Sequence, residues 1–224
     1  MPAVFVTSTG TDIGKTFVTA GLIRHFRNAG RAVTAIKPIV TGFDPDTAAG
    51  SDPGVLLDAL GHPVTAEEID RISPWRLTAG VAPELAAKRE GRTIDFRALV
   101  DFSQRAMNKN AMLLIEGVGG VMVPLDHRHT VIDWISALRV PVILVVGSYL
   151  GTISHTLTAL HVLAQRNLST VAVVVSETPG SPVPLDETAG SISRFADMIG
   201  VIPLPRPADS AQAETAFGAL AALL

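Results

Sequence analysis

Short apolar runs alternate along the chain with longer segments of helical periodicity. The runs are rich in β-branched residues and show little polar alternation, as is typical of parallel strands covered by helices on both faces. The predicted strands are Ala3–Thr7, Ala32–Ile36, Met112–Ile115, Val142–Val146 and Val171–Val175. The predicted helices are Thr16–Asn28, Asp95–Met107, Val131–Leu138, Ile153–Gln165 and Ala211–Leu223. This alternation predicts an α/β fold, a three-layer sandwich with a mostly parallel sheet.

Two segments do not follow the alternation. Residues Pro38–Gly54 are rich in Gly, Pro, Asp and Thr, and Glu177–Pro184 reads ETPGSPVP, so both are predicted to be long loops. Long loops in such folds usually carry function. Because the chain has 224 residues and no internal repeat or low-complexity stretch, residues 1–224 are expected to form one domain.

The composition excludes several kinds of function. A net charge of -3 offers no basic field for nucleic acid. The absence of Cys rules out thiolate zinc sites, iron–sulfur clusters and a Cys nucleophile. The start of the chain lacks a signal peptide, and the longest aliphatic run, Val142–Val146, is far shorter than the ~20 residues that span a bilayer. We therefore expect a cytoplasmic protein that binds neither nucleic acid nor membranes.

The first predicted strand leads through a turn into the first predicted helix, with the sequence VFVTSTGTDIGKT over residues 4–16. Free N–H groups at a helix start bind phosphate, so this segment predicts a phosphate-binding loop of the NTPase type. Lys15 can reach the β and γ oxygens, and the Thr16 hydroxyl can bind Mg²⁺. The strict motif has a glycine five positions before Gly14, where Thr9 stands instead. The change from strand to helix still favours nucleotide binding over a chance match.

Two charged residues directly follow predicted strands. Lys37 follows Ile36, and Glu116 follows Ile115 and precedes a glycine-rich stretch. The carboxyl ends of parallel strands form the edge where open α/β sheets bind ligands, so we favour a functional role for both, Glu116 with Mg²⁺. The alternatives are a surface lysine and a structural ion pair. Asp52 fits a metal site and a helix N-cap equally well, with Pro53 as the first helical residue.

Motifs spread over essentially the whole chain resemble those of the dethiobiotin synthetase family. They are VTSTGTDIGKT (6–16), KPIVTG (37–42), SD (51–52), APELAA (82–87), EGVGG (116–120) and PVILVVGSYLGTISH (141–155). The resemblance implies an ATP-dependent cyclo-ligase of biotin biosynthesis that forms C–N bonds. It would convert 7,8-diaminononanoate and CO₂ to the cyclic urea dethiobiotin, through a carbamate and a carbamic–phosphoric anhydride, with release of ADP and phosphate.

The resemblance also implies a role for each matching position. The catalytic residues would be Lys37, Lys15 and Thr11. Mg²⁺ would be held by Thr16, Asp52 and Glu116. The nucleotide would contact Asp12, Ile13, Gly14, Lys15, Thr16, Phe17, Ser176, Glu177, Pro203 and Leu204. The organic substrate would contact Lys37, Thr41, Gly119, Gly120, Leu150, Gly151, Thr152 and Ser154. In the family the last four bind the substrate carboxylate from the partner subunit, which implies a homodimer, although ordinary helix capping would use the same residues.

The sequence departs from the family pattern at four positions. Ser8 stands where Gly is common, Asp12 where Glu is frequent and Glu84 where His is common. Ser176 stands where the adenine-reading residue is usually Asn. Because Ser offers fewer hydrogen bonds than Asn, we predict weaker discrimination between ATP and other triphosphates.

Two other protein classes share this type of sheet and loop. Nucleotide-switch ATPases of the plasmid-partitioning and division-site type carry an additional lysine near the start of the loop, whereas no Lys precedes Lys15 here. The segment Ala211–Leu224 also lacks the Lys and Arg of a basic membrane helix. Amide-forming relatives of cobalamin synthesis add a glutaminase with a Cys nucleophile, for which this chain has neither the length nor the Cys. The switch ATPase is the main alternative.

Overall fold

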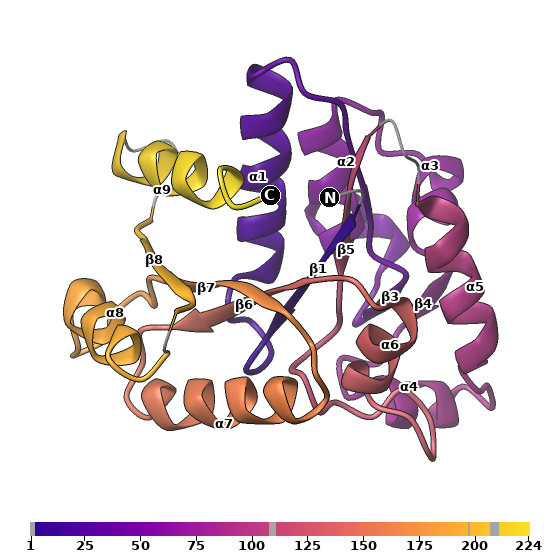
Figure 1. The fold of residues 1–224 in the computed structure, drawn as a ribbon. Helices are drawn as coiled ribbons and strands as arrows, with labels where there is room; N and C mark the ends of the chain where they lie inside the picture. Colours follow the sequence, from indigo (N-terminus) through magenta and orange to yellow (C-terminus); the bar gives the residue numbers. More distant parts are fainter. Residues whose placement is uncertain (1–2, 108–110, 197, 207–210) are drawn as a thin grey trace.

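A computed structural model describes residues 3–107, 111–196, 198–206 and 211–224. Six parallel strands form its main sheet (Figure 1). In spatial order they are β2 (Val33–Ile36), β5 (Met112–Glu116), β1 (Ala3–Ser8), β6 (Val142–Gly147), β7 (Thr170–Ser176) and β8 (Gly200–Leu204). The predicted parallel sheet is confirmed. The order places β5 between β2 and β1, so the ends of these three strands lie next to one another.

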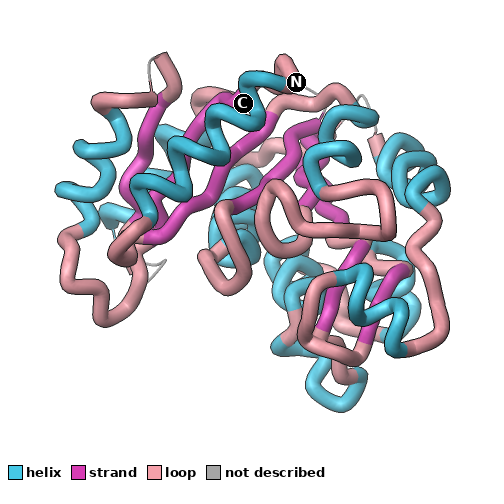
Figure 2. Tube along the Cα trace, turned by 90° about the horizontal axis from the view of Figure 1, so that it is seen from below, coloured by secondary structure: helices cyan, strands magenta, loops and turns pink. Residues whose placement is uncertain are grey.

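Helices cover both faces of the sheet, as the tube view shows (Figure 2). On one face α1 (Lys15–Asn28) packs against α2 (Asp52–Leu60) and α9 (Ala211–Ala221). Right-handed crossovers put the helices that precede β5, β6, β7 and β8 on the other face. There α5 (Phe96–Ala106) packs against α6 (Val131–Leu138), and α7 (Thr152–Gln165) packs against α8 (Leu185–Ser193). The three-layer sandwich expected from the sequence is confirmed.

The central strands are buried because both of their faces carry apolar side chains. Every residue of β1 is buried, and the ring of Phe5 meets the ring of Trp134 edge to face with centroids 4.7 Å apart. The indole N–H of Trp134 donates to the hydroxyl of Ser103 at 3.2 Å, so its polar atom is satisfied inside the core. At Gly21 an added Cβ would lie 1.9 Å from the ring of Phe217, so a glycine is needed where α9 packs on α1.

Several elements were not predicted. A separate two-stranded parallel sheet joins β3 (Ile39–Thr41) to β4 (Trp75–Leu77), and these strands are too short to show periodicity. Helices α3 (Ala66–Ile72), α4 (Pro83–Arg89) and α8 were also missed, as was β8. The prediction of one long loop over residues 38–54 is wrong, because this segment contains β3, the 3₁₀ helix η1 (Pro45–Gly50) and the start of α2. The second predicted loop, over residues 177–184, contains no helix or strand.

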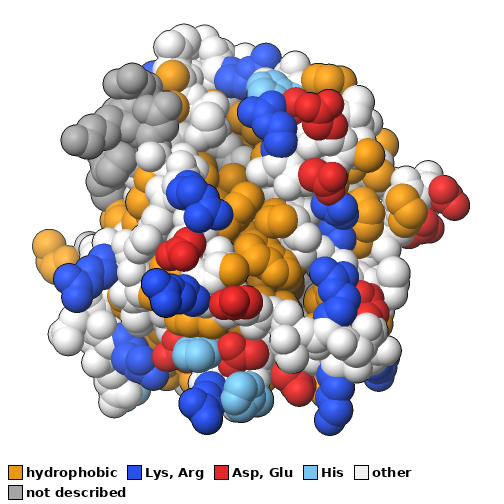
Figure 3. Space-filling view, turned by 90° about the vertical axis from the view of Figure 1, so that its right-hand side faces the viewer, with side chains coloured by type: hydrophobic (Ala, Val, Ile, Leu, Met, Phe, Trp, Pro, Cys, Tyr) orange, Lys and Arg blue, Asp and Glu red, His pale blue; other side chains and the backbone are white. Residues whose placement is uncertain are grey.

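The surface over α3, α4 and α5 carries apolar side chains at its centre, surrounded by charged side chains of both signs (Figure 3). Neither sign dominates this face, in keeping with the small net charge of -3. Within the described residues, no helix is long and apolar enough to cross a membrane. That residues 1–224 form one domain stays a prediction.

Candidate active site

The phosphate-binding loop connects β1 to α1. Gly14 precedes the helix with φ of +110°, a left-handed conformation that favours glycine, and its carbonyl accepts the N–H of Val18 at 3.0 Å to begin the helix. The Lys15 ammonium donates to the hydroxyl of Ser8 and to the carbonyl of Gly10, both at 3.1 Å. Burial, and then the nearby charge of Lys37, lower the pKa of Lys15 to about 8. Lys15 is therefore a buried cation whose hydrogen-bond acceptors are uncharged, so it can bind an anion.

Thr16 lies between two carboxylates that come from distant parts of the chain. Its hydroxyl oxygen is 2.8 Å from Oδ1 of Asp52 and 2.7 Å from Oε1 of Glu116. One hydroxyl hydrogen can serve only one acceptor at a time, so the Thr16 hydroxyl can satisfy only one of the two carboxylates. This arrangement is typical of oxygens that surround a cation.

Lys37 follows β2 and is 2% exposed, so the surface-lysine alternative is wrong. Its ammonium donates to Oε1 of Glu116 at 2.8 Å and to the carbonyl of Gly117 at 2.7 Å, and it pairs with Oδ2 of Asp52 at 3.0 Å. Burial would lower the pKa of Lys37, but the Glu116 and Asp52 carboxylates outweigh burial and raise it. Lys37 is therefore charged at neutral pH.

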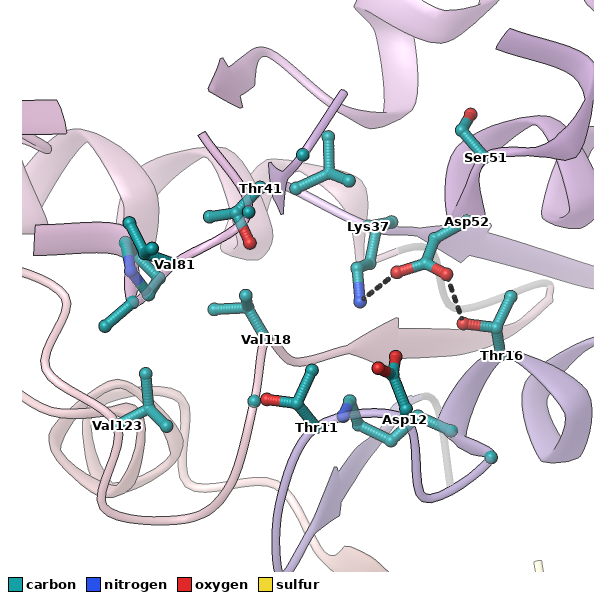
Figure 4. A pocket seen from close by; sticks show the side chains of 18 of the residues that line it. Thr11, Asp12, Thr16, Lys37, Thr41, Ser51, Asp52, Val81, Val118 and Val123 are labelled. Atoms are coloured by element: carbon teal, nitrogen blue, oxygen red, sulfur yellow. Dashed lines mark hydrogen bonds and ion pairs between the residues drawn. The ribbon is translucent and has the colours of Figure 1, made fainter. Parts of the chain in front are cut away.

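Asp52 is not the N-cap of α2, so that alternative is wrong. Ser51 holds the N-cap position, where its hydroxyl accepts the N–H of Gly54 at 3.3 Å, and Asp52 is the first residue of the helix. Its carboxylate turns toward Lys37 and Thr16, as the close view shows (Figure 4). Burial would raise the pKa of Asp52, but Lys37, Thr16 and Lys15 together outweigh burial and lower it.

Glu116 ends β5 with its side chain fully buried. It makes the ion pair with Lys37 that the structural alternative anticipated. Its second oxygen, Oε2, has no hydrogen-bond partner in the described part of the chain. A buried carboxylate oxygen without a donor is costly, so this atom points to a cation that the protein itself does not provide. The strand order brings Glu116 between Lys37 and the phosphate-binding loop.

A cavity of about 590 Å³ opens at this edge of the sheet. Lys15 and Lys37 are the lysines of its lining. Val81 and Val123 lie at the end away from Lys37, and Val118 lies between them and Lys37 (Figure 4). The predicted site residues that line it are Thr11, Asp12, Gly14, Lys15, Thr16, Phe17, Lys37, Thr41, Asp52 and Gly119. The structure thus brings these predicted residues together from four separate segments of the chain.

Other predicted residues lie beside the cavity or away from it. Gly120 packs on the backbone of Thr9, where an added Cβ would lie 3.1 Å from the Thr9 carbonyl group. Ile13 is partly buried against the core. Ser176 is the last residue of β7 and pairs in register with Leu204, the last residue of β8. Glu177 directly follows Ser176, and Pro203 pairs with Val175. Four further predicted residues lie at or just before the start of α7 and do not line the cavity: Leu150, Gly151, Thr152 and Ser154.

Sequence reasoning missed Arg206, which lines the cavity near Gly14. Its guanidinium lies over the ring of Phe17, 4.6 Å from the centroid, and donates to the hydroxyl of Ser176 at 3.4 Å. Arg206 stands in an irregular segment between two prolines, where no periodicity or motif marks it. The apolar lining from Val81 and Val123 was missed for the same reason.

Comparison with known proteins gives both a family model and close relatives. A model described as an AAA domain matches residues 2–212. The ATP-dependent dethiobiotin synthetase BioD of Acidiphilium cryptum (strain JF-5) is 45% identical over 207 residues, 92% of this chain and 92% of the relative. The ATP-dependent dethiobiotin synthetase BioD of Phenylobacterium zucineum (strain HLK1) is 46% identical over 225 residues, 99% of this chain and 96% of the relative.

Solved structures of other classes share the fold at low sequence identity. The septum site-determining protein MinD of Pyrococcus horikoshii, complexed with Mg-ADP, has a TM-score of 0.56 at 18% identity, and the alignment covers 98% of this chain and 93% of the MinD chain. Cobyrinic acid a,c-diamide synthase of Mycobacterium smegmatis, with bound ADP and magnesium, has a TM-score of 0.55 at 16% identity, and the alignment covers 99% of this chain and 93% of the synthase chain. By sequence, both classes are alternatives to a dethiobiotin synthetase. Because all three share the fold, the fold alone does not distinguish between them.

Proposed function

Because this chain belongs to the family of ATP-dependent dethiobiotin synthetases, we propose that the cavity at Lys37 is its active site. The enzyme is an ATP-dependent ligase of biotin biosynthesis. One observation carries the assignment of the site: a single cavity joins buried cations at one end to valine side chains at the other. The first suits a triphosphate, and the second suits the alkyl chain of 7,8-diaminononanoate.

The phosphate-binding loop would hold ATP by its phosphates. The backbone N–H groups from Gly14 to Phe17 begin α1, where free N–H groups and the helix dipole favour an anion. Lys15 would exchange its neutral partners for the β and γ oxygens. Asp12 and Ile13 would shape the turn, and Asp12 already adopts the left-handed conformation, with φ of +57°.

Lys37 and Thr11 would act on the reacting groups. One amine of the substrate takes up CO₂ as a carbamate and loses a proton. A carbamate oxygen attacks the γ phosphorus, and the bond from this phosphorus to ADP breaks. The second amine then attacks the carbonyl carbon of the anhydride, closes the cyclic urea and expels phosphate. The Lys37 ammonium would neutralise the carbamate and the transferring phosphoryl group. The Thr11 hydroxyl would donate a hydrogen bond to the phosphoryl group. Thr41, Gly119 and Gly120 would position the diamine.

The oxygens near Thr16 fit a magnesium ion. Mg²⁺ binds proteins through one or two carboxylates together with substrate phosphates, and Asp52, Glu116 and the Thr16 hydroxyl provide such a set. The unpartnered Oε2 of Glu116 is the observation that calls for the ion. When bound, Mg²⁺ supplies positive charge to the phosphate oxygens.

Glu116→Gln tests the metal assignment, because it keeps the shape of the side chain and removes its charge. We expect Mg²⁺-dependent tightening of ADP binding to fall by roughly tenfold or more, as for the loss of a metal ligand or its support. Titration calorimetry with and without Mg²⁺ measures this. An unchanged magnesium dependence would assign Glu116 to the ion pair alone.

We further propose that the enzyme works as a cytoplasmic homodimer and that the start of α7 completes the active site of the partner subunit. Leu150 is 80% exposed, and Gly151 has φ of +99° just before the helix. The N–H of Thr152 donates to the carbonyl of Tyr149 at 3.1 Å, whereas the N–H of Ser154, at a helix start outside the chain's own cavity, would be offered to the substrate carboxylate.

Mixing two inactive variants tests the shared site. Lys37→Ala removes the cation, and Ser154→Glu repels a carboxylate. If each site takes Lys37 from one subunit and Ser154 from the other, a mixed dimer keeps one intact site, so co-expression should restore about a quarter of the normal activity. No recovery, or a monomer by analytical ultracentrifugation, would contradict the proposal.

The proposed function is tested with the purified enzyme, MgATP, bicarbonate and 7,8-diaminononanoate. We expect dethiobiotin by mass spectrometry and ADP release that depends on the diamine. ATP hydrolysis at the same rate with and without the diamine, with no dethiobiotin formed, would favour the nucleotide-switch ATPase instead. Omission of bicarbonate from degassed buffer is the control and should abolish the product.

A further inference from the structure

We propose that Arg206 reads the nucleotide base and lets the enzyme use GTP as well as ATP. This inference rests on the proposed binding of a triphosphate by the phosphate-binding loop. It concerns the end of the cavity opposite the valine side chains, where Gly14, Phe17 and Arg206 form the lining.

The position of Arg206 follows from the direction in which a nucleotide must extend. With its terminal phosphates between Lys15 and Lys37, a nucleotide continues past the first turn of α1, away from Lys37. Here Arg206 and Ser176 press against the loop: a Cβ added to Gly14 would lie 2.7 Å from Nη2 of Arg206 and 2.7 Å from Oγ of Ser176. A base leaving the loop therefore meets Arg206, which lines the cavity, whereas Ser176 beside it is buried and outside the lining.

Arg206 is held in place before any ligand arrives. Its backbone N–H donates to Oε2 of Glu177 at 2.7 Å, and the N–H of Glu177 donates to the carbonyl of Leu204 at 2.9 Å. The segments that follow β7 and β8 are thereby tied together. The ring of Phe17 supports the guanidinium from below at 4.6 Å. A side chain held in this way loses little freedom when it binds a ligand.

The chemistry of the guanidinium distinguishes the two purines. A guanidinium only donates hydrogen bonds. The outer edge of guanine offers two acceptors, N7 and O6, which match the two N–H groups of an arginine, whereas adenine offers N7 beside an amino group that also donates. The hydroxyl of Ser176 can donate or accept, so it does not restore a preference for adenine. Arg206 thus favours guanine at this edge and gives a physical basis for the weaker base discrimination that the sequence predicts.

Kinetics with Arg206→Gln test the proposal. Glutamine provides one donor and one acceptor, the pattern that pairs with N7 and the amino group of adenine. For the unmodified enzyme we expect kcat/KM with GTP within roughly tenfold of that with ATP, and for Arg206→Gln a shift of the ratio toward ATP by roughly tenfold, the size of one lost bidentate contact. Arg194→Ala, at the end of α8, is the matched control and should leave the ratio unchanged.

Binding measurements separate base recognition from phosphate recognition. Titration calorimetry of GDP and ADP with Arg206→Ala, without diamine, should show a larger loss for GDP than for ADP. An equal loss would mean that the guanidinium contacts phosphates, which both nucleotides share, and would overturn the proposal. A strict preference of the unmodified enzyme for ATP would also overturn it. If no dethiobiotin forms even with ATP, the proposed function fails, whereas product from ATP with an unshifted ratio refutes only the role of Arg206.

Discussion

The two ends of the proposed nucleotide site are held in different ways. At the phosphate end Lys37 is 2% exposed and contacts two carboxylates and a carbonyl, all within 3.0 Å. At the base end the side chain of the exposed Arg206 has, among the residues that the structure describes, one hydrogen bond, at 3.4 Å, and one aromatic contact. Buried charges are costly without close partners, so the phosphate end tolerates few changes, whereas the base end can vary. We therefore expect the chemistry of the reaction at the first end and the choice of nucleotide at the second.

The largest effect is expected from Lys37→Ala at the phosphate end. Without this cation, no group in its position neutralises the transferring phosphoryl group, so kcat should fall by about 10²–10³-fold. Nucleotide affinity should fall far less, because Lys15 and the backbone of the loop remain. Steady-state kinetics and calorimetry measure the two effects.

Lys88→Ala is the matched control for Lys37→Ala. Lys88 lies exposed on α4 and outside the cavity lining, so its removal should leave kcat unchanged. A thermal unfolding curve for each variant separates lost activity from lost folding. If Lys37→Ala changed kcat by less than tenfold, the proposed contrast between the two ends would be contradicted.

A smaller effect is expected from pH, because the pKa of Lys15 is about 8 in the free enzyme. Phosphates raise this pKa on binding, so the free enzyme must take up a proton above pH 8. Affinity for ADP should therefore be constant below about pH 7 and weaken by up to tenfold per pH unit above pH 8. Calorimetry in two buffers with different ionisation enthalpies measures the proton uptake.

Lys15→Arg sharpens the pH prediction, because arginine stays charged throughout this range. Its affinity for ADP should show no loss between pH 8 and pH 9.5. An unmodified enzyme that binds ADP equally well at both pH values would show that Lys15 does not take up the proton.

The smallest effect is expected at the base end from Ser176→Ala. The hydrogen bond that this change removes is long, at 3.4 Å, and Arg206 keeps its contact with Phe17. The ratio of kcat/KM for GTP and ATP should change by less than about threefold, in line with the loss of one long, weak hydrogen bond. A change as large as that of Arg206→Gln would assign base reading to the serine hydroxyl instead.

The phosphate-binding loop could be predicted because its information is local. The strand, turn and helix over residues 3–28 each leave a pattern that nearby residues determine, and the structure places β1 and α1 within one residue of the predicted bounds. Asp52 could not be resolved in this way. Ser51 and Asp52 are both good N-cap residues, and only the geometry of α2 shows that Ser51 holds the position.

Arg206 marks the limit of sequence reasoning at the base end. It leaves no pattern, because its role depends on contacts with Phe17 and Ser176, which come from other segments of the chain. The short strands β3 and β4 were missed for a related reason, since three residues each are too few for periodicity and their pairing brings together residues far apart in sequence.

The sequence by itself determined five of the six strands of the main sheet, the segment expected to bind phosphate, and the family that the motifs resemble. Only the tertiary structure decided which charges meet. The strand order β2-β5-β1 places Glu116 between Lys37 and Thr16, although 79 residues separate it from the first and 100 from the second. A buried charge needs a partner within a few ångströms, and the fold rather than the local sequence selects that partner.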